Sequence, residues 1–474
     1  MKTKIIATIG PASSSKTILK KLIFAGVDVF RLNFSHGSYD EFSQIIADIH
    51  DLNRKLETHV AILADLQGPK IRIGNIEGGG IDLKKNDEIV FSTLPTETGD
   101  GKVFINYRHF PADVQKGEKI LLDDGKITLM VSEVVNETEV KAKVLIGGKL
   151  TSRKGVNLPD TEISLPSLSE KDKDDVEFIT GHDVDWIGLS FVRAAKDVEE
   201  LRDLIRKVSR KNVPTIIAKI EKPEAVKNIE SIMEVAQGIM IARGDLGVEV
   251  PLHTVPVIQK RIVKRCLAMN KPVIIATQMM EGMMYNSRPT RAEVNDVANS
   301  VMDGADALML SGETSVGNYP VEAVETMEKI IREVEIFEDI YNKNQKPVKA
   351  NNPRFISDSV IYSGCNMAHE AHARAIVSVA SSGYSAAKIA SHRPKSTIYA
   401  FASDEFILRR LNLVWGIKPM FFDRCINTDQ TIADLTMELK KKGMVEQGDL
   451  LVHISNMPIN EPGKSNMLKL SHVE

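Results

Sequence analysis

The chain has 474 residues, about three times the ~150 of a typical domain, which leaves room for two or three domains with sizeable cores. A hydrophobic fraction of 43% and a charged fraction of 26% exclude a disordered, collagen-like or coiled-coil chain and are typical of a soluble globular protein. With 61 Lys and Arg against 64 Asp and Glu, the net charge of −3 excludes a surface devoted to gripping nucleic acid or an anionic membrane.

The N-terminal stretch predicts no secretion signal, because its apolar run is broken at Thr8 and again at Gly10-Pro11. No run of ~18 apolar residues follows, so we expect no membrane span. The cysteines at 266, 365 and 425 lie far apart, which favours neither a disulfide framework nor a zinc site. These features predict a cytoplasmic protein.

Short β-branched runs, most of them followed by a stretch of helical periodicity, recur along the chain and predict βα units. The eight runs are Lys4–Gly10, Val27–Ser35, Val60–Gly68, Trp186–Phe191, Thr215–Glu221, Ile239–Val248, Val273–Met279 and Ala307–Glu313. Eight such units predict an α/β fold of the (β/α)8 TIM-barrel type. Each run ends in polar residues, and the carboxyl ends of barrel strands share one face, so we expect these side chains to converge on one mouth.

A β-rich texture with Gly- and Asp-rich turns interrupts the barrel pattern at roughly 69–167. It predicts an inserted, barrel-like domain that grows from the loop after the third strand and acts as a lid over the mouth. The barrel then comprises 1–68 and 168–342. A polar segment with two prolines, Asn342–Pro353, predicts a linker, and 343–474 is expected to form a C-terminal α/β domain.

Two strand ends carry carboxylates suited to a metal. Lys219 and Glu221 are two apart on a strand and therefore point to the same side, although a plain strand-end salt bridge would have the same spacing. Asp245 follows the next strand, after a glycine that lets a ligand approach the backbone. Hard divalent ions in phosphate chemistry are commonly held by one or two carboxylates plus substrate oxygens, so this pair predicts a magnesium site.

The segment 31–37, RLNFSHG, places Arg31 as an anion clamp after the second strand, with Asp65 one strand further. Common alternatives are absent, since the chain has no G-x-G-x-x-G, no H-E-x-x-H and no complete P-loop. His369 and His372 look metal-like, but their spacing favours a solvated helix face.

A series of sequence motifs runs in order along the chain. The motifs are ATIGPAS at 7–13, RLNFSHG at 31–37, GPKIR at 68–72, KGVNLP at 154–159, FVR at 191–193, AKIEKPEA at 218–225, ARGDLGVE at 242–249, ATQMME at 276–281, RPTRAEVNDVAN at 288–299 and SGET at 311–314. By these motifs the chain resembles the pyruvate kinase family over nearly its whole length. The resemblance implies transfer of the phosphoryl group of phosphoenolpyruvate to ADP, giving pyruvate and ATP. It also implies dependence on Mg²⁺, with Mn²⁺ able to replace it, and a homotetramer.

The resemblance also assigns roles to residues at the mouth. Arg31 and Lys219 would clamp the transferring phosphoryl group, Glu221 and Asp245 would hold the metal, and the Gly244 and Asp245 amides would receive the substrate carboxylate. Thr277 would lie beside the enolpyruvate, with Ser311 and Glu313 in a polar relay behind it, and the proton donor stays open. The nucleotide-side positions would be Asn33, His36, Arg72 and Lys154.

One departure from the family pattern bears on potassium. Many members carry Asp-Thr-Lys-Gly-Pro-Glu after the third strand, whereas residues 65–70 of this chain read Asp-Leu-Gln-Gly-Pro-Lys. Lys70 replaces the glutamate, and Leu66 replaces a threonine that helps to bind the ion in the family. The chain therefore resembles the potassium-independent branch, with the Lys70 ammonium predicted to supply the missing positive charge.

In the C-terminal domain, Ser381, Ser382, Gly383 and Ser385 lie in a turn between a strand and a helix. Such a turn can bind phosphate, but serines that simply cap the helix would have the same sequence. The resemblance favours a site for a phosphorylated allosteric effector without naming it. Two other functions stay open: a pyruvate-enolate aldolase or lyase, and a catalytically silent sugar-phosphate sensor.

Overall fold

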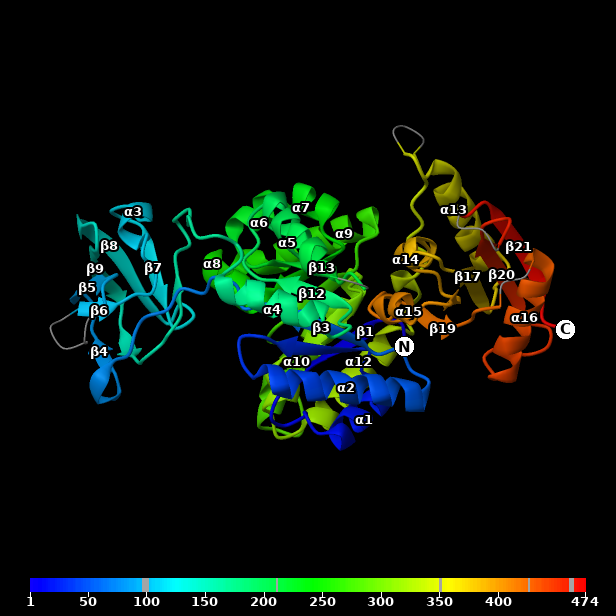
Figure 1. The fold of residues 1–474 in the computed structure, drawn as a ribbon, viewed down its shortest axis with the longest axis horizontal. Helices are drawn as coiled ribbons and strands as arrows, with labels where there is room; N and C mark the ends of the chain where they lie inside the picture. The colour runs from blue at the N-terminus through cyan, green and yellow to red at the C-terminus, as the bar shows by residue number, and fades with distance from the viewer. Residues whose placement is uncertain (96–101, 210–211, 349–351, 425–426, 460–463) are drawn as a thin grey trace.

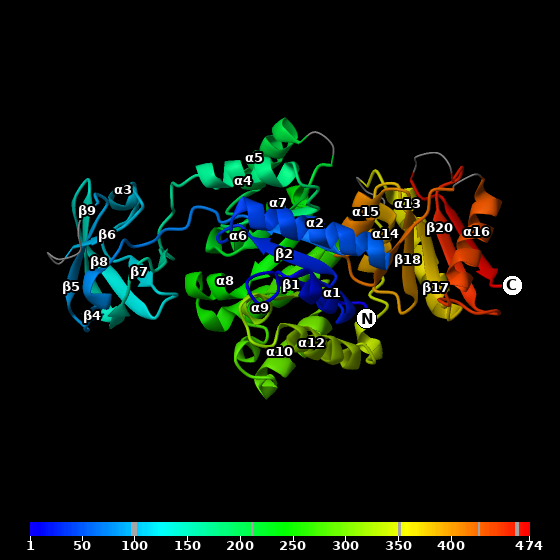
Figure 2. The same ribbon diagram turned by 60° about the horizontal axis from the view of Figure 1, so that its bottom comes forward.

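The structure, a computed structural model, describes residues 1–95, 102–209, 212–348, 352–424, 427–459 and 464–474. A closed barrel lies in the middle, with the inserted domain and the C-terminal domain at opposite ends of it (Figures 1 and 2). The closed parallel barrel, the curled sheet of the inserted domain and the C-terminal α/β domain confirm the predicted fold class. None of the described helices is long and apolar enough to cross a membrane.

The barrel is built from the eight predicted runs. Its strands are β1 (Lys4–Thr8), β2 (Val29–Asn33), β3 (Ala61–Asp65), β12 (Trp186–Leu189), β13 (Thr215–Ile220), β14 (Gly238–Ala242), β15 (Val273–Ala276) and β16 (Ala307–Leu310). Closure is made by β1 and β16, which pair in parallel from Lys4↔Ala307 to Ala7↔Leu310. The outer helices are α1 (Lys16–Phe24), α2 (Tyr39–Leu56), α4 (Glu170–Thr180), α5 (Ala195–Val208), α6 (Pro223–Lys227), α7 (Ile229–Val235), α8 (Arg243–Glu249), α9 (Val255–Met269), α10 (Arg291–Asp303), α11 (Gly312–Ser315) and α12 (Pro320–Val334).

The predicted sixth run is wrong beyond Ala242. Strand β14 ends there and α8 begins at once, so Asp245 lies in the first turn of a helix rather than on a strand. A carboxylate in a first turn is favoured by the positive end of the helix dipole.

The barrel interior is filled by side chains from alternate strand positions and by one residue from outside the barrel. Ile217, Leu63 and Met240 belong to this buried cluster, and Leu413 of the C-terminal domain joins it with 1% exposure. Leu413 follows α15 (Glu405–Leu411), which packs near the amino ends of the strands in Figure 1. The C-terminal domain thus contributes a side chain to the barrel core.

Truncating this side chain should destabilise the protein. We expect Leu413→Ala to lower the free energy of unfolding by about 2–5 kcal/mol, because a large apolar group leaves a cavity in a packed core. Leu252→Ala is the matched control, since Leu252 is 73% exposed. Urea titration should separate the two variants; equal midpoints would show that Leu413 is dispensable for the core.

The inserted domain has its own buried core, which includes Phe91 and Ile120. Its elements are β4 (Ile81–Leu83), β5 (Glu88–Ser92), β6 (Lys102–Phe104), α3 (Phe110–Asp113), β7 (Lys119–Leu122), β8 (Ile127–Asn136), β9 (Glu139–Ile146), β10 (Gly148–Leu150) and β11 (Val156–Asn157). The segment 71–73 forms only isolated bridges, Arg72↔Gly155 and Ile73↔Ile105, because it is the crossing between barrel and inserted domain.

The C-terminal domain is a sheet of order β19-β18-β17-β20-β21. Its elements are α13 (Phe355–Glu370), β17 (Ala375–Val379), α14 (Tyr384–Ser391), β18 (Thr397–Ala402), β19 (Ile417–Phe421), α16 (Thr428–Lys441), β20 (Leu450–Ser455) and β21 (Met467–His472). Buried ion pairs join it to the barrel: Arg409 Nε lies 2.8 Å from Asp185 Oδ1, and Arg393 Nη1 lies 3.2 Å from Asp306 Oδ1. Part of the predicted linker, 349–351, and Cys425 lie outside the described residues.

Candidate active site

The candidate site lies where interior strand positions continue beyond the apolar core to the carboxyl end of the barrel. Ile217 packs inside the barrel, and Lys219 and Glu221 follow at the same side of β13. The same alternation places Arg31 after Val29 and Asp65 after Leu63. Because residues two apart on a strand point to the same side, the charged side chains form a layer directly above the apolar core positions.

Four charged side chains form one connected network in this layer. Arg31 contacts Asp65 Oδ2 through Nε at 2.7 Å and Nη2 at 2.6 Å. Lys219 Nζ lies 3.1 Å from Asp65 Oδ1, 2.9 Å from Glu221 Oε1 and 2.7 Å from Ser190 Oγ. Two cations and two carboxylates thus lie side by side at strand ends that are far apart in the sequence.

The network keeps its central groups charged. Burial disfavours the charged form of Lys219, but the charges of Asp65 and Glu221 outweigh burial and raise the pKa of the ammonium. Burial likewise works against the Asp65 carboxylate, yet Lys219 and Arg31 lower its pKa. A fixed positive charge at the mouth is what the transfer of an anionic group requires.

Glu221 and Asp245 have the chemistry of a site for a hard cation. Burial, and then the nearby charge of Asp245, raise the pKa of Glu221, whose Oε2 accepts a hydrogen bond from the Phe191 amide at 2.7 Å. A divalent ion between the two carboxylates would relieve their repulsion. The part of the chain that the structure describes holds no group of three or more His, Cys, Asp or Glu that could bind a metal, so other ligands would come from substrate and water.

Thr277 lies in a strained loop directly after β15. Its φ is 70° and that of Gln278 is 54°, a region that non-glycine residues rarely adopt. The Arg243 guanidinium donates to the carbonyls of both residues, at 2.9 and 3.3 Å. The Gly244 amide donates to Thr277 Oγ1 at 2.7 Å, so this predicted carboxylate receptor is engaged by a neighbouring side chain.

Ser311 and Glu313 are brought together, but through the backbone. Glu313 is buried, and its two oxygens accept from the Ser311 amide at 2.7 Å and the Met280 amide at 3.0 Å. The Ser311 hydroxyl is buried without a partner among the described residues. Glu313 therefore holds two active-site loops, and among the described contacts it meets Ser311 through the backbone amide and not through the hydroxyl.

The four predicted nucleotide positions form two separate pairs. Asn33 and His36 line a cavity of about 720 Å³ on the barrel, next to Pro11. Arg72 and Lys154 belong to the inserted domain, where Lys154 Nζ pairs with Asp123 Oδ1 at 2.7 Å and Arg72 donates to the Arg153 carbonyl. The cavity that Asn33 and His36 line includes neither Arg72 nor Lys154.

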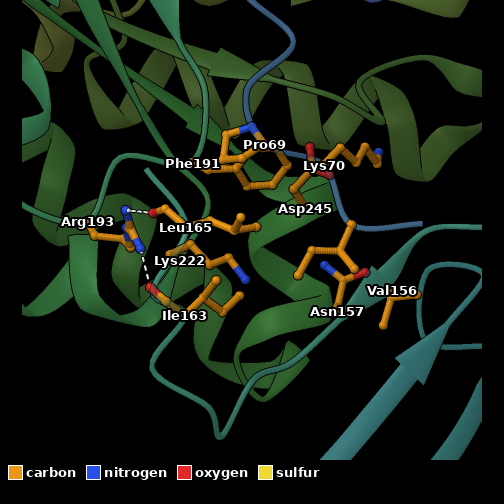
Figure 3. Close-up of a pocket in the computed structure, with 11 residues that line it drawn as sticks. Pro69, Lys70, Val156, Asn157, Ile163, Leu165, Phe191, Arg193, Lys222 and Asp245 are labelled. Carbon is orange, nitrogen blue, oxygen red and sulfur yellow. Dashed lines mark hydrogen bonds between the residues drawn. The ribbon is translucent and has the colours of Figure 1, made fainter. Parts of the chain in front are cut away.

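Lys70 does not reach Asp65. Within the described ranges its ammonium has no ion-pair partner, and both oxygens of Asp65 are taken by Arg31 and Lys219. Lys70 lines a cavity of about 30 Å³ at the junction of barrel and inserted domain, together with Asp245 and Lys222 (Figure 3). Leu66 is buried at 1% exposure, and its hydrocarbon side chain offers no ligand to an ion.

The predicted effector turn is exposed at Ser381 and Ser382. Helix α14 begins after Gly383, whose φ is 82°, and no side chain caps its first turn. The Ser385 hydroxyl lies 2.7 Å from that of Ser465. The serine-capped turn that the sequence left open is thus not formed.

His369 and His372 are both exposed, as expected for a solvated surface.

Several residues that support the site without lining its charged network were not predicted from the sequence. Arg243 pairs with Asp296 at 2.7 Å, Arg193 binds the inserted domain, and Lys222 pairs with Glu249 at 2.6 Å. Most of these lie inside the matching motifs, next to residues that were predicted. Their partners lie tens of residues away, and spacing alone gives no signal for such pairs.

Comparison with known proteins identifies the family. The family model described as the barrel domain of pyruvate kinase matches residues 1–324, and the model of its alpha/beta domain matches 358–471. Pyruvate kinase of Geobacillus stearothermophilus is 43% identical over 473 residues, covering 99% of this chain and 80% of that protein. Pyruvate kinase of Staphylococcus aureus (strain MRSA252) is 41% identical over 474 residues, with the same coverage. The crystal structure of a pyruvate kinase from Cryptosporidium parvum superposes with a TM-score of 0.93 and 33% identity, covering 100% of this chain and 96% of that chain.

Proposed function

The chain belongs to the pyruvate kinase family and is a phosphotransferase, and we propose that the network at its barrel mouth carries out the transfer from phosphoenolpyruvate to ADP. The observation that carries this proposal is the buried contact of Lys219 with Asp65 and Glu221, beside Arg31. A silent sensor would not need this buried charge. An aldolase or lyase would not need the nucleotide-side cations Arg72 and Lys154.

In the proposed reaction Arg31 and Lys219 surround the transferring phosphoryl group. The bond between phosphorus and the enol oxygen breaks as a bond to an oxygen of the ADP β-phosphate forms, and the enolate then gains a proton at its methylene carbon. The transition state is loose and spreads negative charge over the phosphoryl oxygens, so fixed cations stabilise it. The inserted domain, acting as a lid, would exclude water as a competing acceptor.

Glu221 and Asp245 would hold Mg²⁺, or Mn²⁺ in its place. When bound, the ion supplies positive charge to substrate oxygens and orients them. The two carboxylates would position it, and Lys219, 2.9 Å from Glu221 Oε1, favours the ionised form of Glu221.

The organic part of the substrate would lie against α8 and Thr277. The Asp245 amide, and the Gly244 amide once it exchanges its bond to Thr277, would receive the substrate carboxylate. Thr277 would face the enolate, while Glu313 and Ser311 hold its loop. The nucleotide would bind Asn33 and His36 on the barrel and meet Arg72 and Lys154 when the inserted domain approaches.

We propose further that the chain divides into a barrel of 1–68 and 168–342, an inserted lid of 69–167 and a regulatory domain of 343–474. The separate buried cores of the three parts support this division. A homotetramer and a cytoplasmic site of action are proposed from the family alone.

Activity should need no added potassium. The cleft gathers several substrate anions, and in a partly desolvated site a cation must be bound or built in. Lys70 supplies that cation, provided its free ammonium swings toward the phosphates when substrates bind. Lys70→Glu with Leu66→Thr should create a potassium requirement, because it removes the charge and restores a polar ligand.

The rate should be measured in tetramethylammonium buffer with and without potassium chloride at matched ionic strength. Strong activation of the parent enzyme by potassium would contradict the proposal that Lys70 supplies the cation.

The turn at 381–385 should bind the phosphate of an activator. The double substitution Ser382→Asp and Ser385→Asp would repel the activator phosphate, so this variant should lose activation and keep basal activity. Titration with sugar phosphates and nucleoside monophosphates checks this, with Ser363→Asp on α13 as an exposed control. A double variant that still responds to every activator of the parent would remove the turn from regulation.

The proposed function is tested by pyruvate formation from phosphoenolpyruvate in a coupled assay. We expect formation to depend on both ADP and a divalent metal. Pyruvate released at the same rate without ADP would point to another chemistry.

A further inference from the structure

Glu249 is a buried carboxylate that joins three parts of the active site. Its side chain is 1% exposed, and its Oε1 accepts from Lys222 Nζ at 2.6 Å and from Asn157 Nδ2 at 2.7 Å. Its Oε2 is buried without a hydrogen-bond partner among the described residues. A buried charge with so few partners is costly, which makes its position sensitive to the donors that it has.

Two of these connections lead to the proposed metal carboxylates. Glu249 ends α8 and lies four residues after Asp245, so both point to the same side of this short helix. Lys222 directly follows Glu221 at the end of β13. A shift of Glu249 therefore moves the helix that carries one carboxylate and the residue next to the other.

The third connection leads into the inserted domain. Asn157 ends β11, which pairs with β7 through Asn157↔Leu121. A Cβ on Gly125, in the turn after β7, would lie 3.7 Å from Val248, so this turn also lies against α8. The turn includes Asp123, the partner of nucleotide-side Lys154. Lys154, Asp123 and the turn that follows thus lie close to α8, the helix that carries Asp245.

A second set of contacts links the inserted domain to the same carboxylates. The Arg193 guanidinium donates to the carbonyls of Ile163 and Leu165, in the return segment of the inserted domain (Figure 3). Two residues earlier, the Phe191 amide donates to Glu221 Oε2, and Phe191 has a φ of 54°. The inserted domain is thus linked to Lys222 through Asn157 and Glu249, and to Glu221 through the segment 191–193.

We propose that Glu249 is a positioning residue that couples the inserted domain to the two metal carboxylates. When Asn157 moves, Glu249 moves with it, and this shifts Lys222 beside Glu221 and the helix α8 that carries Asp245. Divalent-metal affinity and the seating of the inserted domain then depend on each other, as linkage requires. The inference rests on the proposed function, because it takes Glu221 and Asp245 as the metal carboxylates.

The test measures Mn²⁺ binding without substrate, by the electron paramagnetic resonance signal of the free ion. Asn157→Ala removes only the link to the inserted domain and leaves the Lys222–Glu249 pair intact. Outer contacts that orient ligands are typically worth about 10–100-fold in metal affinity, so we expect a loss of about tenfold. Asn136→Ala, at the end of β8, where the side chain accepts from Thr138 within its own hairpin, should stay within about twofold of the parent.

Hydrogen exchange of residues 154–165 supplies a second readout. Mg²⁺ should slow exchange there in the parent and Asn136→Ala, but not in Asn157→Ala. A purely structural asparagine would raise exchange equally with and without the ion. Glu249→Gln, which removes the charge but keeps the shape, should also weaken Mn²⁺ binding.

The outcomes separate the two proposals. If Glu221→Gln binds Mn²⁺ like the parent, the metal site is wrong and the coupling falls with it. If Glu221→Gln loses Mn²⁺ while folded Asn157→Ala binds it like the parent, the metal site stands and the coupling through Glu249 is overturned.

Discussion

Lys219→Met should lower the turnover number by about 10²–10³-fold while the protein stays folded. A fixed charge aimed at developing negative charge in a site shielded from water is typically worth about 3–4 kcal/mol of transition-state stabilisation. Methionine keeps the length and the apolar stem of the side chain and removes the ammonium that joins Asp65, Glu221 and Ser190.

The measurement is the steady-state rate at saturating phosphoenolpyruvate, ADP and Mg²⁺, alongside circular dichroism. Lys260→Met serves as a control, because Lys260 is an exposed lysine paired with Asp303 on the outer helices. Near-normal turnover in folded Lys219→Met would remove this lysine from the chemistry.

Glu221→Gln should raise the Mg²⁺ concentration needed for half-maximal rate by about tenfold or more. Metal affinity at oxygen sites follows the number of charged ligands, and glutamine removes one of the two carboxylates while keeping a carbonyl oxygen. The amide also leaves Lys219 with one anionic partner fewer, so some loss of maximal rate should accompany the shift.

A magnesium titration of the parent, Glu221→Gln and the exposed control Glu230→Gln checks this expectation. Glu230 is an exposed residue of α7 that pairs with Arg265 of α9 on the outer surface of the barrel. An unchanged titration in Glu221→Gln would exclude Glu221 as a ligand of the ion.

The strand ends could be predicted from the sequence because they depend on local periodicity. Alternation along β13 is enough to place Lys219 and Glu221 on the same side as Ile217, and eight such runs are enough to predict closure. The boundary at Ala242 was not predictable in this way. The apolar residues after it suit a strand and a helix equally, and only the three-dimensional setting of α8 decides.

Contacts between residues far apart in the chain could not be predicted from the sequence. Leu413 enters the barrel core from another domain, and Asn157 reaches Glu249 across 92 positions. The same limit applies to Lys70, whose ammonium does not reach Asp65. The charge of Asp65 is already balanced by Arg31 and Lys219, so no unpaired anion draws the Lys70 ammonium inward.

The most direct test of the account follows phosphoenolpyruvate and ADP with the purified enzyme by ³¹P nuclear magnetic resonance, in Mg²⁺ and without potassium. The account predicts that the phosphoenolpyruvate signal is replaced by the γ-phosphate of ATP, one ATP for each pyruvate, and that Lys219→Met abolishes most of this exchange. Inorganic phosphate as the main product, or unchanged phosphoenolpyruvate with the parent enzyme, would contradict phosphoryl transfer at this mouth.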